Sequence, residues 1–241
     1  MIEFVAETGS TNAVLSARLS GGEALAEGFW LRAGRQTDGR GRAGRAWISP
    51  QGNLYCSTVV NLRPGDPSPA TLALIAGLAV HDMVADALSQ GRARNIDPQL
   101  KWPNDLMLGG AKIAGILCEM IDRTVVIGIG VNVASAPDLP DRPTTSLCGQ
   151  GLEADAVVVL TMLAQHFAAR LDEWRERPLG DMLAAWEARA TPRGTPITVH
   201  ADMPIAGAFD GLDNDGSLRL RLEDGSCRAI YAGEVILREN D

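Results

Sequence analysis

Residues 39–45 concentrate positive charge on a flexible backbone, because they hold three arginines and three glycines in seven positions. A guanidinium group is planar and permanently charged, so it can bind a carboxylate or a phosphate through two parallel hydrogen bonds. Glycine allows the backbone to approach a ligand closely. An arginine-rich loop is commonly just solvated, but this chain is acidic as a whole, with a formal net charge of −8. The local basic segment therefore predicts a site for a small anionic ligand.

The same glycines also satisfy the spacing G-x-G-x-x-G, at Gly39, Gly41 and Gly44. A dinucleotide fingerprint needs a helix directly after the glycines and an acidic residue about twenty positions later. Residues 47–53 instead resemble a strand end and a turn, and no acidic residue stands between Asp38 and Asp66. The pattern therefore excludes a Rossmann-type pyrophosphate site at this loop.

Two short groups of polar residues follow later and contain both lysines of the chain. The first group is Lys101 with Asn104 and Asp105, and the second is Lys112 with Gly115. An ammonium is a compact point charge, whereas a carboxylate can hold a magnesium ion through its oxygens. These groups favour a site where cations meet phosphates and a carboxylate holds the metal.

A glycine-rich apolar segment, residues 128–133, completes this set. Gly128 and Gly130 lack side chains, so a strand that contains them leaves a hollow on the face of its sheet. Asn132 lies near the end of this segment, and Trp47 ends the arginine loop. Because an indole can stack on a nucleotide base, the pattern predicts a nucleotide-binding cavity.

The sequence offers no candidate for a nucleophilic side chain or for a cysteine–histidine metal site. It has neither a Walker A segment nor a G-x-S-x-G segment, and its three histidines are scattered. Its four cysteines show no C-x-x-C spacing, which indicates buried thiols in a reducing compartment. The chemistry that remains is attack of a bound carboxylate on a phosphate, for which a protein supplies position and positive charge.

Short links between apolar segments predict an α+β fold, with a mixed or antiparallel sheet and helices on one side of it. The turn Gly109-Gly110 joins two segments in a hairpin, which brings Asp105 and Lys112 to the same end of the sheet. The expected strands are residues 2–6, 29–34, 54–62, 106–108, 111–121 and 124–133, and the expected helices are residues 13–19, 71–88, 155–176 and 179–189.

The pattern changes after residues 191–194, which resemble a linker. From Thr195 onward, short alternating segments are separated by turns rich in aspartate and glycine. We therefore expect two domains: residues 1–190 form the catalytic domain that binds the ligands, and residues 191–241 form a small SH3-like β-barrel.

The acidic balance argues against general binding to nucleic acid or to anionic membranes. The first residues contain no basic region followed by an apolar stretch, so no signal peptide is expected. No apolar run of membrane-spanning length is expected either. These observations predict a cytoplasmic protein.

Five motifs together resemble the biotin–protein ligases, in that family's order and spacing. The resemblance covers essentially the whole chain and identifies it as a bacterial member of the family. Only residues 1–9 precede the first motif, so the chain resembles the ligase-only class, which lacks an N-terminal DNA-binding domain. The motifs are Ser10-Thr11-Asn12, Gly39-Arg40-Gly41-Arg42-Ala43-Gly44-Arg45-Ala46-Trp47, Lys101-Trp102-Pro103-Asn104-Asp105, Lys112-Ile113-Ala114-Gly115-Ile116-Leu117 and Gly128-Ile129-Gly130-Val131-Asn132-Val133.

The resemblance implies a class II synthetase-like catalytic domain and a two-step reaction with ATP, biotin and Mg²⁺. In the first step, biotin and ATP give biotinyl-5′-AMP and diphosphate. In the second step, biotin passes to a lysine of a biotin carboxyl carrier protein, or of such a domain in a biotin-dependent carboxylase. Family members dimerise through the edge of the sheet, so the resemblance leaves a homodimer open.

The resemblance also assigns roles to single residues. Lys112 would bridge the biotin carboxylate and the α-phosphate, while Arg40 and Arg42 would close over the adenylate. Asp105 would hold magnesium. The implied biotin site is Ser10, Thr11, Asn12, Gln36, Gly39, Arg40, Arg42, Lys112 and Gly115. The implied ATP site is Arg45, Trp47, Lys101, Asn104, Asp105 and Asn132.

Several alternatives stay open at this point. Ser10 or Thr11 could simply cap the helix that follows, Trp102 could serve packing alone, and Asp105 could pair with an arginine. Asp38 departs from the small uncharged residue common beside Gly39 in the family, and it could pair with an arginine of the loop. At the level of function, a lipoate or octanoate ligase or transferase of the same fold and a non-catalytic biotin sensor remain.

Overall fold

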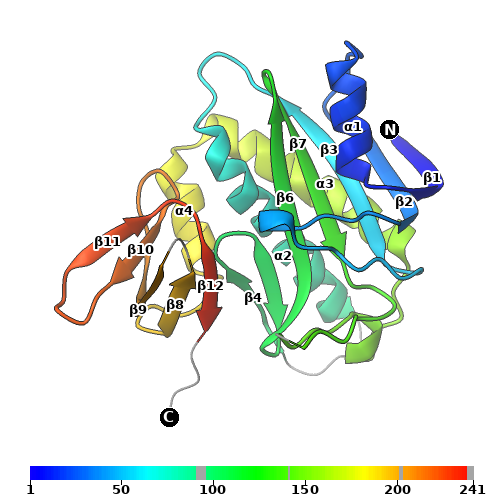
Figure 1. The fold of residues 1–241 in the computed structure, drawn as a ribbon. Helices are drawn as coiled ribbons and strands as arrows, with labels where there is room; N and C mark the ends of the chain where they lie inside the picture. Colours follow the sequence, from blue (N-terminus) through cyan, green and yellow to red (C-terminus); the bar gives the residue numbers. More distant parts are fainter. Residues whose placement is uncertain (91–95, 141, 201–202, 238–241) are drawn as a thin grey trace.

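A seven-stranded mixed sheet carries most of the chain in this computed structural model, which describes residues 1–90, 96–140, 142–200 and 203–237. The strand order is β1-β2-β3-β7-β6-β5-β4 (Figure 1). Only β1 and β2 are parallel, and all other neighbours in this sheet are antiparallel. The strands are β1 (Ile2–Thr8), β2 (Trp30–Gln36), β3 (Leu54–Asn61), β4 (Pro98–Lys101), β5 (Asp105–Leu108), β6 (Ala111–Ile121) and β7 (Thr124–Val131).

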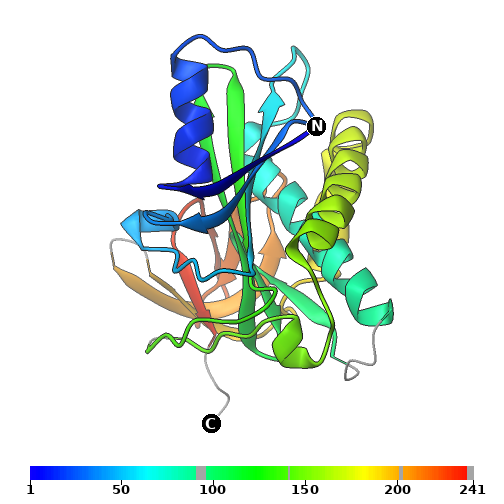
Figure 2. The ribbon, with the colours of Figure 1, turned by 90° about the vertical axis from the view of Figure 1, so that its right-hand side faces the viewer.

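Helices cover both faces of this sheet. The long helices α2 (Leu72–Gln90) and α3 (Ala156–Glu176) lie on one face, and α1 (Thr11–Ser20) lies on the other (Figure 2). Alternation along β7 explains this division, because Val125 belongs to the core of α2 and α3 while Val126 packs in a separate cluster with α1. The predicted α+β class is confirmed. The expectation of helices on one side holds for the long helices but is wrong for α1.

Helix α2 is apolar around most of its circumference. With the preceding 3₁₀ turn it spans Pro69–Gln90, and its most apolar window has a mean hydropathy of 1.5. The expectation that no run reaches membrane-spanning length is therefore wrong by length and composition. However, 61% of that window is buried inside the fold, and the helix packs against α3 and the sheet. Such burial on several sides is typical of the core helix of a globular domain.

The C-terminal part forms a second sheet, in which all neighbouring strands are antiparallel. It follows helix α4 (Leu179–Glu187), and its order is β11-β10-β9-β8-β12. The segment between the two sheets is anchored, because Thr191 N donates to the Leu100 carbonyl at 3.1 Å. The β structure of residues 196–237 agrees with the change of pattern expected from Thr195 onward. Its strands are β8 (Pro196–His200), β9 (Pro204–Leu212), β10 (Leu218–Arg221), β11 (Cys227–Ile230) and β12 (Glu234–Leu237).

The hairpin of β5 and β6 positions the charged groups of the fold. Its turn residues Gly109 and Gly110 have φ angles of +59° and +78°, a conformation that favours glycine. Asp105 pairs in register with Lys101 on β4 and with Gly115 on β6. The predicted hairpin is therefore confirmed, and it brings Lys101, Asp105 and Lys112 to one end of the sheet.

Candidate active site

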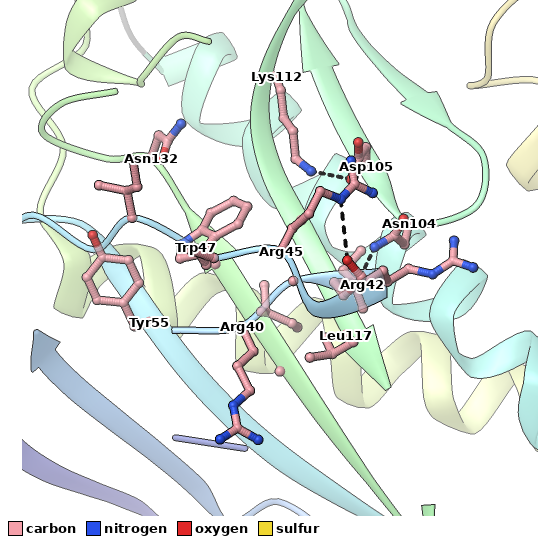
Figure 3. Close-up of a pocket in the computed structure, with 18 of the residues that line it drawn as sticks. Arg40, Arg42, Arg45, Trp47, Tyr55, Asn104, Asp105, Lys112, Leu117 and Asn132 are labelled. Atoms are coloured by element: carbon pink, nitrogen blue, oxygen red, sulfur yellow. Dashed lines mark hydrogen bonds and ion pairs between the residues drawn. The ribbon is translucent and has the colours of Figure 1, made fainter. Parts of the chain in front are cut away.

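A cavity of about 340 Å³ lies over the sheet on the side of α1. Its walls come from α1, the arginine loop, strands β2 to β7, the loop after β7 and the start of β12. Figure 3 shows the side chains that converge on it. Every predicted site residue except Gly39 lines this cavity: Ser10, Thr11, Asn12, Gln36, Arg40, Arg42, Arg45, Trp47, Lys101, Asn104, Asp105, Lys112, Gly115 and Asn132.

Gly39 begins the arginine loop, residues 39–47, which we call the lid. The carbonyl of Gly39 accepts a hydrogen bond from Trp47 N at 2.8 Å, so the two ends of the lid are joined. A Cβ atom on Gly39 would lie 2.5 Å from the Trp47 carbonyl oxygen, which is too close for any side chain. Gly39 therefore shapes the base of the lid and does not face the cavity.

Three glycines leave the predicted hollow in the floor, and side chains enter it. A Cβ atom on Gly130 would lie 2.6 Å from the Trp47 ring, and one on Gly115 would lie 2.9 Å from it. A Cβ atom on Gly128 would lie 2.3 Å from Asn12 Oδ1. The Trp47 indole therefore occupies the floor, and its buried Nε1 has no hydrogen-bond partner among the residues described. An unpaired buried donor costs about 1–3 kcal/mol, which marks this indole as a group that a ligand would satisfy or move.

Asp105 is the centre of a buried charge cluster. Its Oδ1 lies 2.5 Å from Lys112 Nζ, and its Oδ2 lies 3.5 Å from Lys101 Nζ. Burial lowers the pKa of Lys112 below its usual range, and the charge of Asp105 opposes that shift. Asp105 therefore pairs with two lysines. The sequence alone had left open that its partner is an arginine. Lys112 Nζ also lies 5.4 Å from the Trp47 ring centroid (Figure 3).

The donor set fits magnesium only in part. Among the described residues, no group of three or more histidine, cysteine, aspartate or glutamate side chains gathers around one point. Both oxygens of Asp105 already contact ammonium groups. Magnesium is commonly held by one or two carboxylates together with substrate phosphates. Asp105 is the residue that would supply a carboxylate in such an arrangement.

The arginines of the lid already have partners. Arg40 pairs with Asp38 at 2.9 Å, which confirms that Asp38 binds a loop arginine, and its side chain points away from Lys112 (Figure 3). Arg42 Nη1 donates to the Gly233 carbonyl at 3.4 Å, and burial lowers the pKa of Arg42. Arg45 Nε donates to the Arg42 carbonyl at 3.3 Å. These contacts join the lid to the turn before β12.

A chain of polar side chains lines the end of the cavity nearest α1. Thr11 donates to Gln36 Oε1 through both its backbone N, at 2.8 Å, and its hydroxyl, at 3.1 Å. Ser57, fully buried on β3, places its hydroxyl 2.7 Å from both Thr11 Oγ1 and Asn12 Oδ1. Ser10 caps α1 through Ala13 N at 3.5 Å. The cap interpretation is confirmed for Ser10, which lines the cavity as well.

Other predicted residues bond to the backbone. Asn104 Nδ2 donates to the Ile116 carbonyl at 2.5 Å, and Asn132 Nδ2 donates to the Thr145 carbonyl at 3.0 Å. Trp102 is buried, and its Nε1 donates to the Gly216 carbonyl at 3.2 Å. Trp102 therefore packs in the core, but packing alone does not describe it, because it also borders the cavity.

Four functional candidates escaped the sequence analysis: Ser57, Glu119, Arg142 and Glu234. Ser57 left a signal, since it is a hydroxyl within the apolar run of residues 54–60. Glu119 accepts a hydrogen bond from Asn12 Nδ2 at 2.7 Å. Glu234 pairs with Arg45, which lies 189 positions away in the sequence. No local pattern predicts a contact over such a separation.

Comparisons with known proteins agree with this geometry. A sequence model of the biotin/lipoate A/B protein ligase family matches residues 8–133, and one of the biotin protein ligase C-terminal domain matches residues 194–238. The biotin–[acetyl-CoA-carboxylase] ligase of Paracoccus denitrificans is 37% identical over 96% of this chain and 98% of its own length. The enzyme of the same name from Mycobacterium tuberculosis is 36% identical over 98% of this chain and 88% of its own length.

Solved structures show the same fold. The biotin protein ligase of Aquifex aeolicus in complex with biotin and ATP superposes with a TM-score of 0.84 and 28% identity, over 99% of each chain. The biotin protein ligase of Leishmania major in complex with biotinyl-5-AMP gives a TM-score of 0.67 and 27% identity, over 96% of this chain and 98% of that one. The cavity lies in a fold that is known to bind these ligands in other organisms.

Proposed function

This chain belongs to the biotin/lipoate A/B protein ligase family, and we propose that it is a biotin–[acetyl-CoA-carboxylase] ligase. It activates biotin with ATP and transfers the biotinyl group to a lysine of a carrier protein. The observation that carries this proposal is the buried ammonium of Lys112, which faces a cavity lined by the lid arginines. A buried cation beside a cluster of guanidinium groups suits two anions that must react with each other.

In the first step, a carboxylate oxygen of biotin attacks the α-phosphorus of ATP. The bond from that phosphorus to the oxygen of the β-phosphate breaks, so biotinyl-5′-AMP forms and diphosphate leaves. Lys112 donates hydrogen bonds to the carboxylate and the α-phosphate, which offsets their repulsion. Arg45 and Lys101 neutralise the phosphates. Asp105 would hold magnesium, which would supply further positive charge at the phosphates.

In the second step, the amine of the acceptor lysine attacks the acyl carbon of the mixed anhydride. The bond from that carbon to the phosphate oxygen breaks, AMP leaves, and the amine loses a proton as the amide forms. Arg40 and Arg42 close over the adenylate, since guanidinium groups bind phosphates bidentately. Their closure keeps water away from the reactive anhydride until the carrier protein arrives.

The two substrates occupy different parts of the cavity. We place biotin at the end near α1, where Ser10, Thr11 and Gln36 offer hydroxyl, amide and backbone groups to its polar ring. Asn12 borders the same end, and the lid begins beside Gln36 at Gly39, whereas Gly115 lies next to Lys112 and Trp47. The adenine stacks on Trp47, whose indole moves from the glycine floor when nucleotide enters. Asn104 and Asn132 hold the neighbouring backbone of the nucleotide site.

The test is incubation with ATP, magnesium, biotin and a carboxyl carrier domain, followed by mass measurement of the carrier. We expect the carrier to gain the mass of one biotinyl group, and we expect no gain when ATP or biotin is omitted. Exchange of labelled diphosphate into ATP, measured with biotin, lipoate and octanoate in turn, separates the alternatives. Exchange with lipoate or octanoate but none with biotin would reassign the substrate. Binding of biotin without any exchange would make the protein a sensor.

Further parts of the proposal concern the whole chain. We propose residues 1–190 as the catalytic domain, residues 191–241 as an SH3-like domain, and the cytoplasm as the location. The acidic composition argues against binding of nucleic acid or of anionic membranes. A homodimer through the sheet edge is testable by light scattering with and without biotin and ATP, where a mass of one chain in both conditions argues against it.

A further inference from the structure

A second carboxylate lines the cavity, and it joins two loops of the chain. Glu234, at the start of β12, pairs through its Oε1 with Arg45 of the lid. The same oxygen lies 3.1 Å from Arg142 Nη1, in the loop that follows β7. Two arginines that are remote in sequence therefore meet on one carboxylate oxygen at the cavity wall.

Arg142 lies close to the reacting centre. Its side chain is only 20% exposed, and it lines the cavity together with Lys112. The backbone beside it is fixed, because Lys112 N donates to the Pro143 carbonyl at 2.9 Å and Thr145 N donates to the Lys112 carbonyl at 3.0 Å. The positive charge of Arg142 also contributes to the lowered pKa of Lys112, after the larger effect of burial. Arg142 is thus within electrostatic reach of the ammonium that meets the α-phosphate.

Positive charge exceeds negative charge in this cavity. Among the described lining side chains, Asp105 and Glu234 are the acids, and the bases are Arg40, Arg42, Arg45, Lys101, Lys112 and Arg142. A surplus of cations in a partly buried space is unfavourable unless a polyvalent anion fills it. A triphosphate carries the charge and the oxygens that would satisfy such a set.

We propose that Arg142 is a phosphate-binding residue of the nucleotide site, and that Glu234 holds Arg142 and Arg45 in place until the phosphates of ATP bind them. This inference rests on the proposed function. A guanidinium has five N–H donors, so each arginine can turn to a phosphate from its position on Glu234. The carboxylate reduces the repulsion between these two partly buried cations.

The test compares Arg142→Gln with the wild-type chain in biotin-dependent diphosphate exchange, at varied ATP and at varied biotin. We expect the KM for ATP to rise about tenfold, since a charge-assisted hydrogen bond to phosphate is lost, while the KM for biotin changes by less than about twofold. Arg142→Lys restores part of the ATP affinity because it keeps the charge. Arg228→Gln, an exposed arginine on β11, is the matched control and keeps both KM values. An unchanged KM for ATP in Arg142→Gln overturns the proposal.

The variant Glu234→Gln tests whether Arg142 binds phosphate or serves only in a structural ion pair with Glu234. Both variants lose the contact between residues 142 and 234, but only Arg142→Gln loses the phosphate ligand. We therefore expect a clearly smaller rise in the KM for ATP in Glu234→Gln, and equal rises in the two variants overturn the inference. Wild-type protein without biotin-dependent exchange would refute the proposed function. Active wild-type protein with a normal Arg142→Gln variant would refute only the role of Arg142.

Discussion

At the scale of single residues, Lys112 is the side chain on which the proposed chemistry depends. Replacing Lys112 by alanine removes the charge that would stabilise the transition state between carboxylate and phosphate. We expect adenylation to fall about a hundredfold or more, as when a preorganised donor is removed from other active sites. Biotin affinity falls far less, because the contacts near α1 remain. Single-turnover formation of the adenylate and calorimetric binding of biotin measure the two effects, and equal losses in both would remove the assigned role.

Asp105 sets the pH range in which Lys112 stays protonated. Burial lowers the pKa of Lys112, and the negative charge of Asp105 raises it again. Asp105→Asn removes the raising effect, so the pKa of Lys112 falls further. Activity that needs the ammonium is then lost at a lower pH. The alkaline limb of the pH–rate profile is expected to shift to lower pH in the variant, with saturating magnesium in both assays, and a limb that stays in place would contradict this assignment.

At the scale of elements, the lid depends on contacts outside itself. Arg42 reaches Gly233, and Arg45 reaches Glu234, so the lid rests on the turn before β12. We expect biotin and ATP together to protect the lid from trypsin, because its arginines turn inward onto the adenylate. Arg42→Ala is expected to release the intermediate, which would then biotinylate an unrelated lysine-rich protein several-fold more than the wild type does. Unchanged cleavage with ligands, or an intermediate that stays bound in Arg42→Ala, would count against closure.

The elements differ in how far the sequence could predict them. Local signals sufficed for the hairpin of β5 and β6, since its glycine turn determines which residues face each other. They sufficed for α3 as well, which was expected at residues 155–176 and spans Ala156–Glu176, with Asp155 as its N-cap. The face on which α1 packs could not be predicted, because β7 is apolar on both sides. The contact of Arg45 with Glu234 depends on how two sheets come together, and no short-range pattern encodes it.

At the scale of the whole molecule, the two sheets share one apolar core. Trp186 of α4, 2% exposed, belongs to the same buried cluster as Ile197 of β8, Phe209 of β9 and Leu218 of β10. The backbone link between Thr191 and Leu100 adds to this joint. Burial of apolar surface that is shared between two units couples their unfolding.

This coupling leads to a prediction about the proposed boundary at residue 190. We expect one cooperative thermal transition for the whole chain in calorimetry, because separating the sheets would expose Trp186 and its neighbours to water. A chain that ends at residue 190 should unfold at a markedly lower temperature and bind ATP more weakly than the whole chain, since it also lacks Glu234. Trp186→Ala, which leaves a cavity at the joint, is expected to cost about 3–5 kcal/mol of stability. Two separate transitions, of which truncation removes one and leaves the other at its original temperature, would show that the second sheet folds as an independent domain.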